Sequence, residues 1–541
     1  MVCCRVMGVR SVLATALIAV ALTAAGTLAT AAHGQGSAAC GTGHWVAAWT
    51  ADPSGLLGSG YNDQTLRVIL TPHVGADQLR VHISNRFGPQ PIAINHATVA
   101  LRQSGAALIP GTSRQVTFGG QPGVIVPVGG EAISDPASLT FAPFHDLAVS
   151  LYVRGPTGPA TGHYIARERS YASAGSSGDQ TAVEGADPFG SSTTTAPYLD
   201  AVDAVVPAGV GTAVLFGDSI TDGYENAGPG NGEEQGGIDL GHRYPDYLAE
   251  RLIAQPGGPR LSVVNAGIAG NRLLADGQQN LAGASGLSRL EPDVLGVAGV
   301  TDAIVLEGIN DIALLASANQ METALGQVVA KLHARGVHVL LGTISPAGTG
   351  LLNLGNLLPA IYIDSSANAV RVAVNGWIRS GASGADGIVD FDAALHSASL
   401  PNELNPGLDS GDHVHPSYLG YKKMAETVNL DSLRGSQCTP STPRPTTTLR
   451  VRAQARSGHH LLISGSLVPA GSGTCAGAQV TVRALHAGHT LFKRRLRVTA
   501  ACRFSSRRAI RAPGRIEVRV SFAGNANLLA SKARPVYARL R

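Results

Sequence analysis

The stretch Leu215-Phe216-Gly217-Asp218-Ser219-Ile220-Thr221-Asp222-Gly223 starts as a short apolar strand and reaches a serine just after the turn residue Gly217. This order places the Ser219 hydroxyl at the carboxyl end of a strand, exposed to a cleft. A serine hydroxyl becomes a nucleophile when a neighbouring base takes its proton. Serine is also common at helix N-caps. The stretch alone therefore leaves two interpretations of Ser219, a nucleophile and a helix cap.

Around this stretch, apolar strands alternate with helices from Val206 onward. The predicted strands are Ala213–Phe216, Leu261–Val264, Ala303–Leu306, Val337–Leu341 and Gly387–Val389. Between them, apolar residues recur at helical spacing: Leu325, Val328, Val329 and Leu332, then Val370, Ala373, Val374 and Trp377, then Tyr421, Met424, Ala425 and Val428. This alternation predicts a mainly parallel sheet with helices on both faces and catalytic groups at the carboxyl ends of its strands.

A candidate base lies near the end of the same region, in Asp412-His413-Val414-His415-Pro416. A carboxylate three residues before a histidine can bond one ring nitrogen of His415 and leave the other free to face Ser219. Two alternatives remain: a polar loop whose aspartate caps the next helix, and a metal site made by His413, His415 and an aspartate. No second histidine pair accompanies this segment, so we expect no metal and treat His413 as a bystander.

Two strand-to-loop segments can supply donors for a developing oxyanion. In Asn265-Ala266-Gly267-Ile268-Ala269-Gly270-Asn271-Arg272, Gly270 can offer an unobstructed backbone N–H. In Glu307-Gly308-Ile309-Asn310-Asp311, Asn310 can offer a side-chain N–H. Each fragment alone is weak evidence, because glycine and asparagine are ordinary turn residues.

Taken together, Gly-Asp-Ser, the following Gly, Gly-x-Asn-Asp and Asp-x-x-His-Pro resemble the four blocks of the SGNH (GDSL) hydrolase superfamily over about residues 206–433. The resemblance implies a flavodoxin-like parallel sheet. It implies that Ser219 is the nucleophile, that His415 is the base and that Asp412 orients it. Its oxyanion hole would consist of the Ser219 N–H, Gly270 and Asn310. No metal or organic cofactor is implied.

The region before this domain, residues 40–205, has the pattern of an antiparallel β-sandwich. Apolar residues alternate with others in three runs: Leu66, Val68 and Leu70; Leu79, Val81 and Ile83; Leu147, Val149, Leu151 and Val153. We expect a sandwich of jelly-roll kind, with a polar loop or linker from Gly175 to Thr195. HWVAAWTADP, LRVHISNRFG and DLAVSLYVRGPTGP resemble the β-domain of a branch of exported bacterial GDSL esterases, as do VNAGIAGNRLL and LEGINDI.

The first 31 residues have the pattern of a signal peptide, with Arg5 and Arg10 before an apolar run from Val12 to Leu28. A membrane anchor is the alternative, but the run is short and rich in Ala and Thr. We therefore expect a secreted, extracellular protein that has no membrane span after signal removal. Lipid attachment at Cys40 is disfavoured by its distance from the apolar run.

After signal removal, four of the six cysteines remain: Cys40, Cys438, Cys475 and Cys502. An even number in an exported chain favours disulfides, and four cysteines allow three pairings. We expect Cys475–Cys502 within one small domain and Cys40–Cys438 between the two ends of the enzyme body.

The C-terminal part, from the Pro/Thr-rich linker 438–448 onward, differs from the rest in charge. Residues 444–541 contain 19 Lys and Arg and a single acid, Glu517, for a net charge of +18, whereas the whole chain carries +4. Residues 449–541 resemble an immunoglobulin-like sandwich. We expect this domain to bind an anionic cell-wall polymer or polysaccharide and not nucleic acid; a solvated spacer is the alternative.

The sequence thus predicts a monomeric, secreted serine esterase acting on an acetylated polysaccharide or a short-chain acyl ester. The loop from Tyr224 to His242, with Glu225, Glu233, Glu234 and Asp239, shapes the pocket or is a solvated surface loop. An acyltransferase using the same residues is one alternative. Another is an inert polymer-binding protein, which the intact set of motif residues disfavours.

Overall fold

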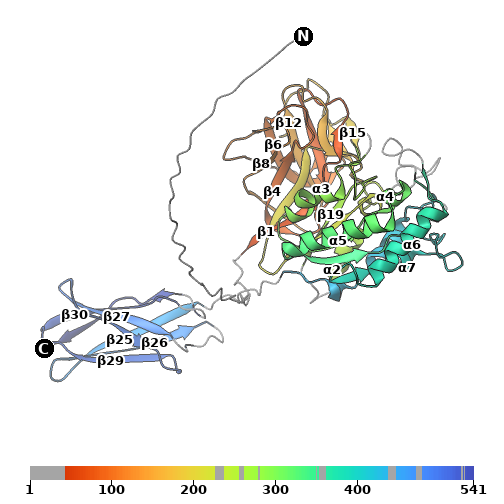
Figure 1. Ribbon diagram of the computed structural model, residues 1–541. Coiled ribbons are helices and arrows are strands. Elements are labelled where there is room, and N and C mark those ends of the chain that lie inside the picture. The colour runs from red at the N-terminus through yellow and green to blue at the C-terminus, as the bar shows by residue number, and fades with distance from the viewer. Residues whose placement is uncertain are drawn as a thin grey trace, which may run out of the picture. The chain divides into compact units, whose positions relative to one another are not determined.

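The computed structural model describes residues 43–225, 237–254, 261–277, 281–348, 350–352, 361–436, 446–470, 475, 478–524, 528 and 530–540. It contains an N-terminal β region, a central α/β region and a C-terminal β region, each with its own hydrophobic core (Figure 1). The predicted signal peptide 1–31, Cys40, Cys438 and linker residues 438–445 lie outside the described residues. No described helix combines the length and apolar character needed to cross a membrane.

The N-terminal region consists of antiparallel sheets, as the period-two pattern predicted. One has the order β1 (His44–Thr50), β17 (Leu199–Val206), β4 (Ala76–Ser84), β10 (Glu131–Ile133), with β11 (Ala137–Phe141) also on β4. The second has the order β15 (Ser191–Thr193), β14 (Ser170–Ala172), β3 (Gln64–Leu70), β12 (Leu147–Val153), β6 (His96–Ser104), β7 (Ala107–Leu108), with β8 (Arg114–Val116) on β6. Smaller sheets join β16 (Ala196–Pro197), β13 (Ala160–His163) and β2 (Gly55–Leu57), and β5 (Ile92–Ile94) with β9 (Val124–Val126). The finer jelly-roll topology stays a prediction.

The segment from Gly175 to Thr195 packs against the N-terminal sheets and contains strand β15, so its interpretation as a linker is wrong. Arg67 of β3 is fully buried, and its guanidinium donates to the carbonyl of Val183 at 2.6 Å. The same guanidinium lies 3.9 Å from the ring centroid of Phe189. A buried arginine needs such acceptors, and the loop supplies them while it covers the outer face of β3.

The central region has a parallel sheet of five strands, and every strand predicted there is present. Their order is β19 (Leu261–Gly267), β18 (Gly211–Gly217), β20 (Val300–Leu306), β21 (His338–Gly342), β24 (Gly387–Val389). In chain order this is 2-1-3-4-5, the flavodoxin-like arrangement, whose switch point lies at the first strand. The chain leaves that first strand, β18, directly into Ser219.

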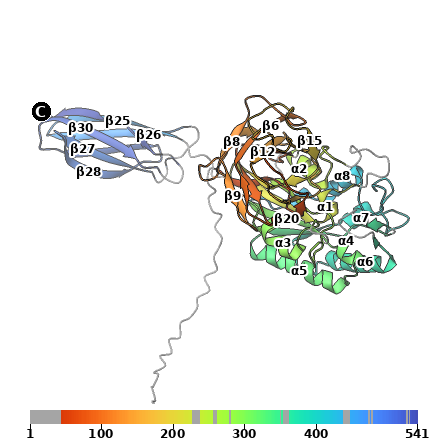
Figure 2. The same ribbon diagram turned by 90° about the horizontal axis from the view of Figure 1, so that it is seen from above.

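Two groups of helices cover the sheet. In one, α2 (Tyr244–Ala254) and α7 (Phe391–Leu395) contact α8 (Tyr418–Thr427). In the other, α5 (Ala318–Ala334) contacts α3 (Gly286–Leu290) and α6 (Ser365–Arg379), and α6 contacts α4 (Ile309–Ala313). Figure 2 shows α2 and α8 on one side of β20 and α3 and α5 on the other. The sheet is therefore covered on both faces, as expected for parallel strands.

Helix α6 forms where predicted, but its predicted buried face is partly wrong. Ala373 is exposed, and the buried face includes Arg371 and Asn375. Asn375 donates to the carbonyl of Ile344 at 2.8 Å, and Arg371 contacts Asp392. Apolar periodicity missed this face because hydrogen-bonded polar side chains occupy part of it.

The C-terminal region is made of two antiparallel sheets around a separate core. One has the order β25 (Thr447–Arg456), β26 (His460–Pro469), β29 (Arg503–Ala509). The other has the order β28 (His489–Arg497), β27 (Gln479–His486), β30 (Gly514–Phe522), β31 (Ser531–Lys532), with β32 (Val536–Leu540) on β30. The predicted disulfide Cys475–Cys502 is present, and β25 begins inside the predicted linker. The immunoglobulin-like identity stays a prediction.

Candidate active site

The turn after β18 places Ser219 as the first residue of the short helix α1 (Ser219–Asp222). The helix cap is Asp218, whose carboxylate accepts the N–H of Ile220 at 3.0 Å, so the interpretation of Ser219 as the cap is wrong. Gly217 permits the tight turn, because a Cβ there would lie 2.1 Å from the hydroxyl oxygen of Thr221. The Ser219 hydroxyl is thereby free for another partner.

That partner is His415, which reaches the serine from 196 residues further along the chain. The Ser219 hydroxyl lies 2.8 Å from His415 Nε2, and His415 Nδ1 lies 2.7 Å from a carboxylate oxygen of Asp412. The other Asp412 oxygen accepts the backbone N–H of His415 at 2.8 Å. Serine, histidine and aspartate thus form one continuous hydrogen-bonded chain.

The Asp412 carboxylate keeps its charge although it is largely enclosed. Burial alone would raise its pKa, but the charge and hydrogen bonds of His415 outweigh burial and hold the pKa below its usual value. An ionised Asp412 fixes the His415 proton on Nδ1, since that nitrogen faces a charged acceptor. Nε2 is then free to accept the proton of Ser219.

His413 does not join this chain of residues. Its Nδ1 pairs with Asp409 at 2.6 Å, and the side chain is 60% exposed. The described residues contain a single group of three side chains close enough to share a metal ion, namely His82, Glu131 and Asp200 of the N-terminal region. Burial alone would lower the pKa of His82, but its bonds to Asp203 and Glu131 raise it to about 10. Within this group one ring nitrogen of His82 pairs with the Glu131 carboxylate at 2.5 Å, and the other pairs with Asp203 at 2.8 Å.

The two predicted donor segments are joined to each other. The Asn310 amide donates to the carbonyl of Asn271 at 2.8 Å, which leaves its second N–H available. Gly270, the neighbour of Asn271, has a φ of 75°, a conformation that favours glycine. Ile268 and Ala269 donate their N–H groups to Gly217 and Asp222, at 3.0 and 2.9 Å, so this loop lies along the nucleophile turn.

Arg289, which the sequence analysis did not single out, ties the ends of the central strands together. It is 1% exposed, and its guanidinium donates to the carbonyls of Gly217 and Ala266 at 2.8 Å each. It also donates to the Asn271 side chain at 2.8 Å and to the Glu307 carboxylate at 3.1 Å. One side chain therefore fixes the carboxyl ends of β18, β19 and β20, from which the site is built. No motif marks it.

The N-terminal β region also reaches the nucleophile turn. His163 of β13 lies 3.2 Å from a carboxylate oxygen of Asp222, whose other oxygen holds Ala269. The other ring nitrogen of His163 lies 2.7 Å from the carbonyl of Asp52. The β region and the parallel-sheet region are thus hydrogen-bonded directly behind Ser219.

Ser219 and His415 both have no exposed surface. The ring of Tyr224 contributes to this enclosure, because its centroid lies 4.6 Å from that of His415. In the predicted pocket loop 224–242, Glu225 is buried and burial raises its pKa to about 7, whereas Asp239 pairs with Arg169. Glu233 and Glu234 lie outside the described residues. Within the described part of this loop, the ring of Tyr224 contacts His415.

The sheet order and the serine–histidine–aspartate chain define the class of a serine hydrolase with a flavodoxin-like sheet. Residues 215–423 match the GDSL-like Lipase/Acylhydrolase family. They form a GDSL-like lipase/acylhydrolase domain, and that family is one of carboxylic ester hydrolases. β-rich regions precede and follow this domain.

Among solved structures, a putative G-D-S-L lipolytic protein from Desulfitobacterium hafniense is 22% identical, with 40% of this chain and 96% of that chain covered and a TM-score of 0.27. An acetylxylan esterase from Geobacillus stearothermophilus is 22% identical, with 43% and 98% covered and a TM-score of 0.29. A GDSL-like lipase from Bacteroides thetaiotaomicron is 17% identical, with 40% and 84% covered and a TM-score of 0.28. No curated protein matches the chain.

Proposed function

We propose that this protein is a secreted serine esterase that hydrolyses carboxylic esters through Ser219, His415 and Asp412. The observation that carries the proposal is the 2.8 Å hydrogen bond between the Ser219 hydroxyl and His415 Nε2. The aligned Asp412 and the family match of the domain support it. Export is supported by the signal-like pattern of residues 1–31.

In the proposed mechanism, His415 Nε2 takes the proton of the Ser219 hydroxyl as the oxygen attacks the ester carbonyl. The oxyanion forms against the N–H groups of Ser219 and Gly270 and the Asn310 amide. The protonated His415 then gives its proton to the departing alcohol, which leaves an acyl-enzyme. Water, deprotonated by His415, cleaves this ester and releases the acid and free Ser219.

We propose that the acyl group is small, such as the acetyl group of an acetylated polysaccharide or of another short-chain ester. The support is the enclosure of the site, since Ser219, His415 and Asn310 have no exposed surface. A long acyl chain would need an open apolar groove beside the serine. A panel of p-nitrophenyl esters from acetate to laurate tests this: turnover should be highest for acetate, and a preference for laurate would contradict it.

Hydrolysis by wild type and by Ser219→Ala tests the catalytic assignment. With p-nitrophenyl acetate, Ser219→Ala should retain less than about one thousandth of the wild-type turnover while its melting temperature is unchanged. A serine-directed phosphonate should label Ser219. A wild type without activity would favour the inert binding protein, and a phosphonate on another serine would contradict the assignment. Product analysis with added alcohol separates hydrolysis from acyl transfer.

A further inference from the structure

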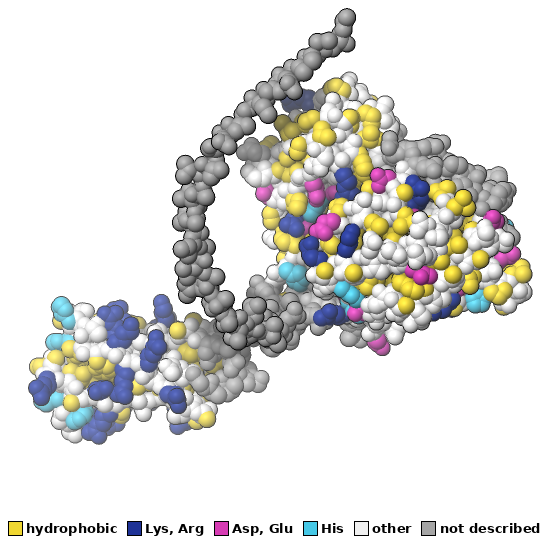
Figure 3. All heavy atoms as spheres, in the orientation of Figure 1, with side chains coloured by type: hydrophobic (Ala, Val, Ile, Leu, Met, Phe, Trp, Pro, Cys, Tyr) yellow, Lys and Arg dark blue, Asp and Glu magenta, His cyan; other side chains and the backbone are white. Residues whose placement is uncertain are grey.

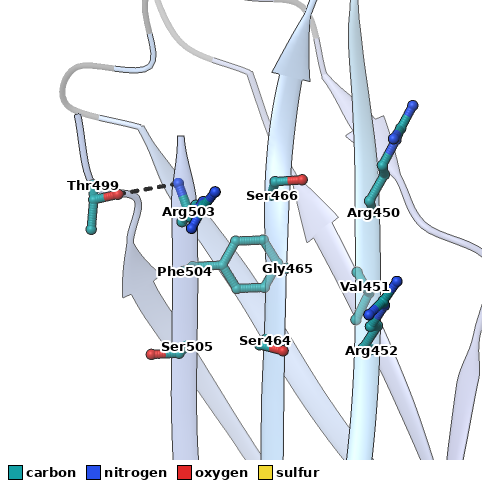
Figure 4. Close-up of a pocket in the computed structure, with 10 residues that line it drawn as sticks. All are labelled: Arg450, Val451, Arg452, Ser464, Gly465, Ser466, Thr499, Arg503, Phe504 and Ser505. Carbon is teal, nitrogen blue, oxygen red and sulfur yellow. Dashed lines mark hydrogen bonds between the residues drawn. The ribbon is translucent and has the colours of Figure 1, made fainter. Parts of the chain in front are cut away.

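The outer face of the sheet β25-β26-β29 presents arginine and serine side chains in two cross-strand rows. In one row, Arg450 pairs with Ser466, which pairs with Arg503; in the other, Arg452 pairs with Ser464, which pairs with Ser505. Figure 4 shows these side chains on three neighbouring strands. With Thr499 they line a shallow hollow of about 610 Å³. We call Arg450, Arg452, Arg503, Ser464, Ser466 and Ser505 the arginine–serine face.

The floor of the hollow is closed by the core of the domain. Phe504 is 3% exposed, and a Cβ at Gly465 would lie 2.4 Å from its ring. The ring therefore packs directly under β26, as Figure 4 shows, and keeps strand β26 close to the core. The face is a rigid surface of defined register, since each of its strands belongs to a hydrogen-bonded ladder.

The positive charge of this face has no acidic partner within the described residues. Arg450, Arg452 and Arg503 are exposed, and no ion pair joins any of them to a described carboxylate. Glu517, the single acid of residues 444–541, pairs instead with Arg519 at 2.6 Å. Figure 3 shows Lys and Arg side chains spread over this domain. A field of this kind attracts polyanions.

The serines indicate which kind of polyanion fits. A guanidinium binds a carboxylate or a phosphate through paired N–H donors. A serine hydroxyl both donates and accepts, so it matches hydroxyl groups. Sugar acids carry carboxylates and hydroxyls on the same unit, whereas a phosphodiester backbone offers the face acceptors alone. Charges about 7 Å apart along β25 and about 10 Å across to β29 suit an extended polymer.

We propose that the arginine–serine face binds a carboxylated polysaccharide and holds the esterase on it. This inference goes beyond the proposed function. Binding needs neither Ser219 nor His415, so its test is independent of whether the protein hydrolyses esters. Other polyanions, including nucleic acid and phosphodiester polymers, are outcomes of the test.

The test measures binding of polygalacturonate to the full chain at low salt. The triple variant Arg450→Gln, Arg452→Gln, Arg503→Gln should bind about tenfold more weakly than wild type, because each exposed ion pair contributes modestly. The matched control is Arg494→Gln, Arg495→Gln, Arg497→Gln on β28, which removes the same charge from exposed residues of the other sheet. The control should bind within about twofold of wild type. An equal loss in both triples would overturn the proposal, because diffuse charge would then explain binding.

The serines are tested without a change of charge. Ser464→Val with Ser466→Val should weaken binding of polygalacturonate and leave binding of duplex DNA unchanged. Thermal unfolding of every variant shows whether the domain remains folded. If the serine variant unfolds, the comparison between the two arginine triples still tests the proposal. Tighter binding of DNA than of polygalacturonate by wild type would overturn the sugar-acid assignment.

Discussion

The Asn310 side chain both holds the site together and can stabilise charge. One amide N–H is used by the carbonyl of Asn271, and the side chain has no exposed surface. The second N–H belongs to a donor whose direction is fixed before substrate arrives. Fixed donors stabilise an oxyanion without reorganisation during the reaction.

Replacing Asn310 separates these two tasks. Asn310→Ala should lower kcat for p-nitrophenyl acetate by about 10²–10³, the usual loss for one oxyanion donor, with little change in KM. Steady-state kinetics and a melting curve check this. If kcat stays at the wild-type value while the melting temperature falls, Asn310 serves the fold alone.

His163 is a buried histidine behind the nucleophile turn. One ring nitrogen faces the carbonyl of Asp52, and the other faces the Asp222 carboxylate and the carbonyl of Ile165. Both nitrogens must donate, since all three partners are acceptors. Burial alone would lower the pKa of His163, but Asp222 and the other hydrogen bonds outweigh burial and raise it above the ordinary value.

A histidine with a raised pKa makes stability depend on pH. Its contribution is complete below the unfolded value of about 6.5 and is lost as pH rises through the higher folded value. The difference in unfolding free energy between wild type and His163→Gln should therefore shrink from pH 6 to pH 9, by about 1.4 kcal/mol per unit of raised pKa. Urea unfolding at several pH values measures it. A constant difference would mean that His163 is neutral.

Motif spacing predicts the residues that perform chemistry better than the residues that support them. Ser219, Gly270, Asn310, Asp412 and His415 follow strands or precede a helix in a recognisable order, and the structure joins Ser219 to His415 and to Asp412 through it. Arg289 and His163 lie outside such patterns, since their partners come from distant parts of the chain. Periodicity carries no information on which distant carbonyl a buried cation will meet.

At the scale of elements, the site depends on the carboxyl ends of β18, β19 and β20, which are held side by side. Arg289 on α3 donates to Gly217 at the end of β18 and to Ala266 near the end of β19, and it pairs with Glu307, just beyond β20. Its guanidinium also lies 4.0 Å from the ring centroid of Phe216. The planar fork of arginine, and not only its charge, matches this set of acceptors.

Lysine at position 289 keeps the positive charge but lacks the planar set of N–H donors of the guanidinium group. Arg289→Lys should lower the free energy of unfolding by about 3 kcal/mol, since buried acceptors lose their donors. It should also lower kcat more than it changes KM, because the segment that carries Gly270 and Asn271 loses its hydrogen bonds to Arg289 and shifts. The control is Arg335→Lys, at an exposed ion pair with Glu291, which should change stability by less than about 1 kcal/mol. Equal effects of the two variants would contradict the role of Arg289.

The positions of strands and helices could be predicted from the spacing of apolar residues wherever burial of apolar side chains determines them. The five parallel strands have that property, and each was predicted within a few residues. Helix α6 and the segment 175–195 differ, because Arg371 is buried on the helix and the segment packs over the buried Arg67 of β3, each arginine with hydrogen-bond partners. A pattern that treats polar residues as exposed cannot place them.

At the scale of the whole molecule, the remaining prediction on covalent structure concerns Cys40 and Cys438. The bond Cys475–Cys502 already pairs the other two cysteines that follow the predicted signal peptide. Peptide mapping of the purified protein under non-reducing conditions should yield one peptide pair that joins Cys40 to Cys438. Two free thiols at these positions would contradict the prediction.

The parallel-sheet region and the C-terminal region have separate hydrophobic cores. We therefore expect that removing the C-terminal region abolishes polymer binding and leaves catalysis intact. The core of the parallel-sheet region runs from Ala47 to Leu433 and includes no described residue of the C-terminal region, whose own core lies within 449–540. A protein that ends at Cys438 should therefore hydrolyse p-nitrophenyl acetate with a kcat/KM within about twofold of the full chain. It should lose retention on polygalacturonate, which in the full chain weakens with salt because the charges are exposed. Full-length Ser219→Ala is the reverse control and should be retained without hydrolysis. Equal retention of the truncated and full-length proteins would show that the basic region is not the binding device.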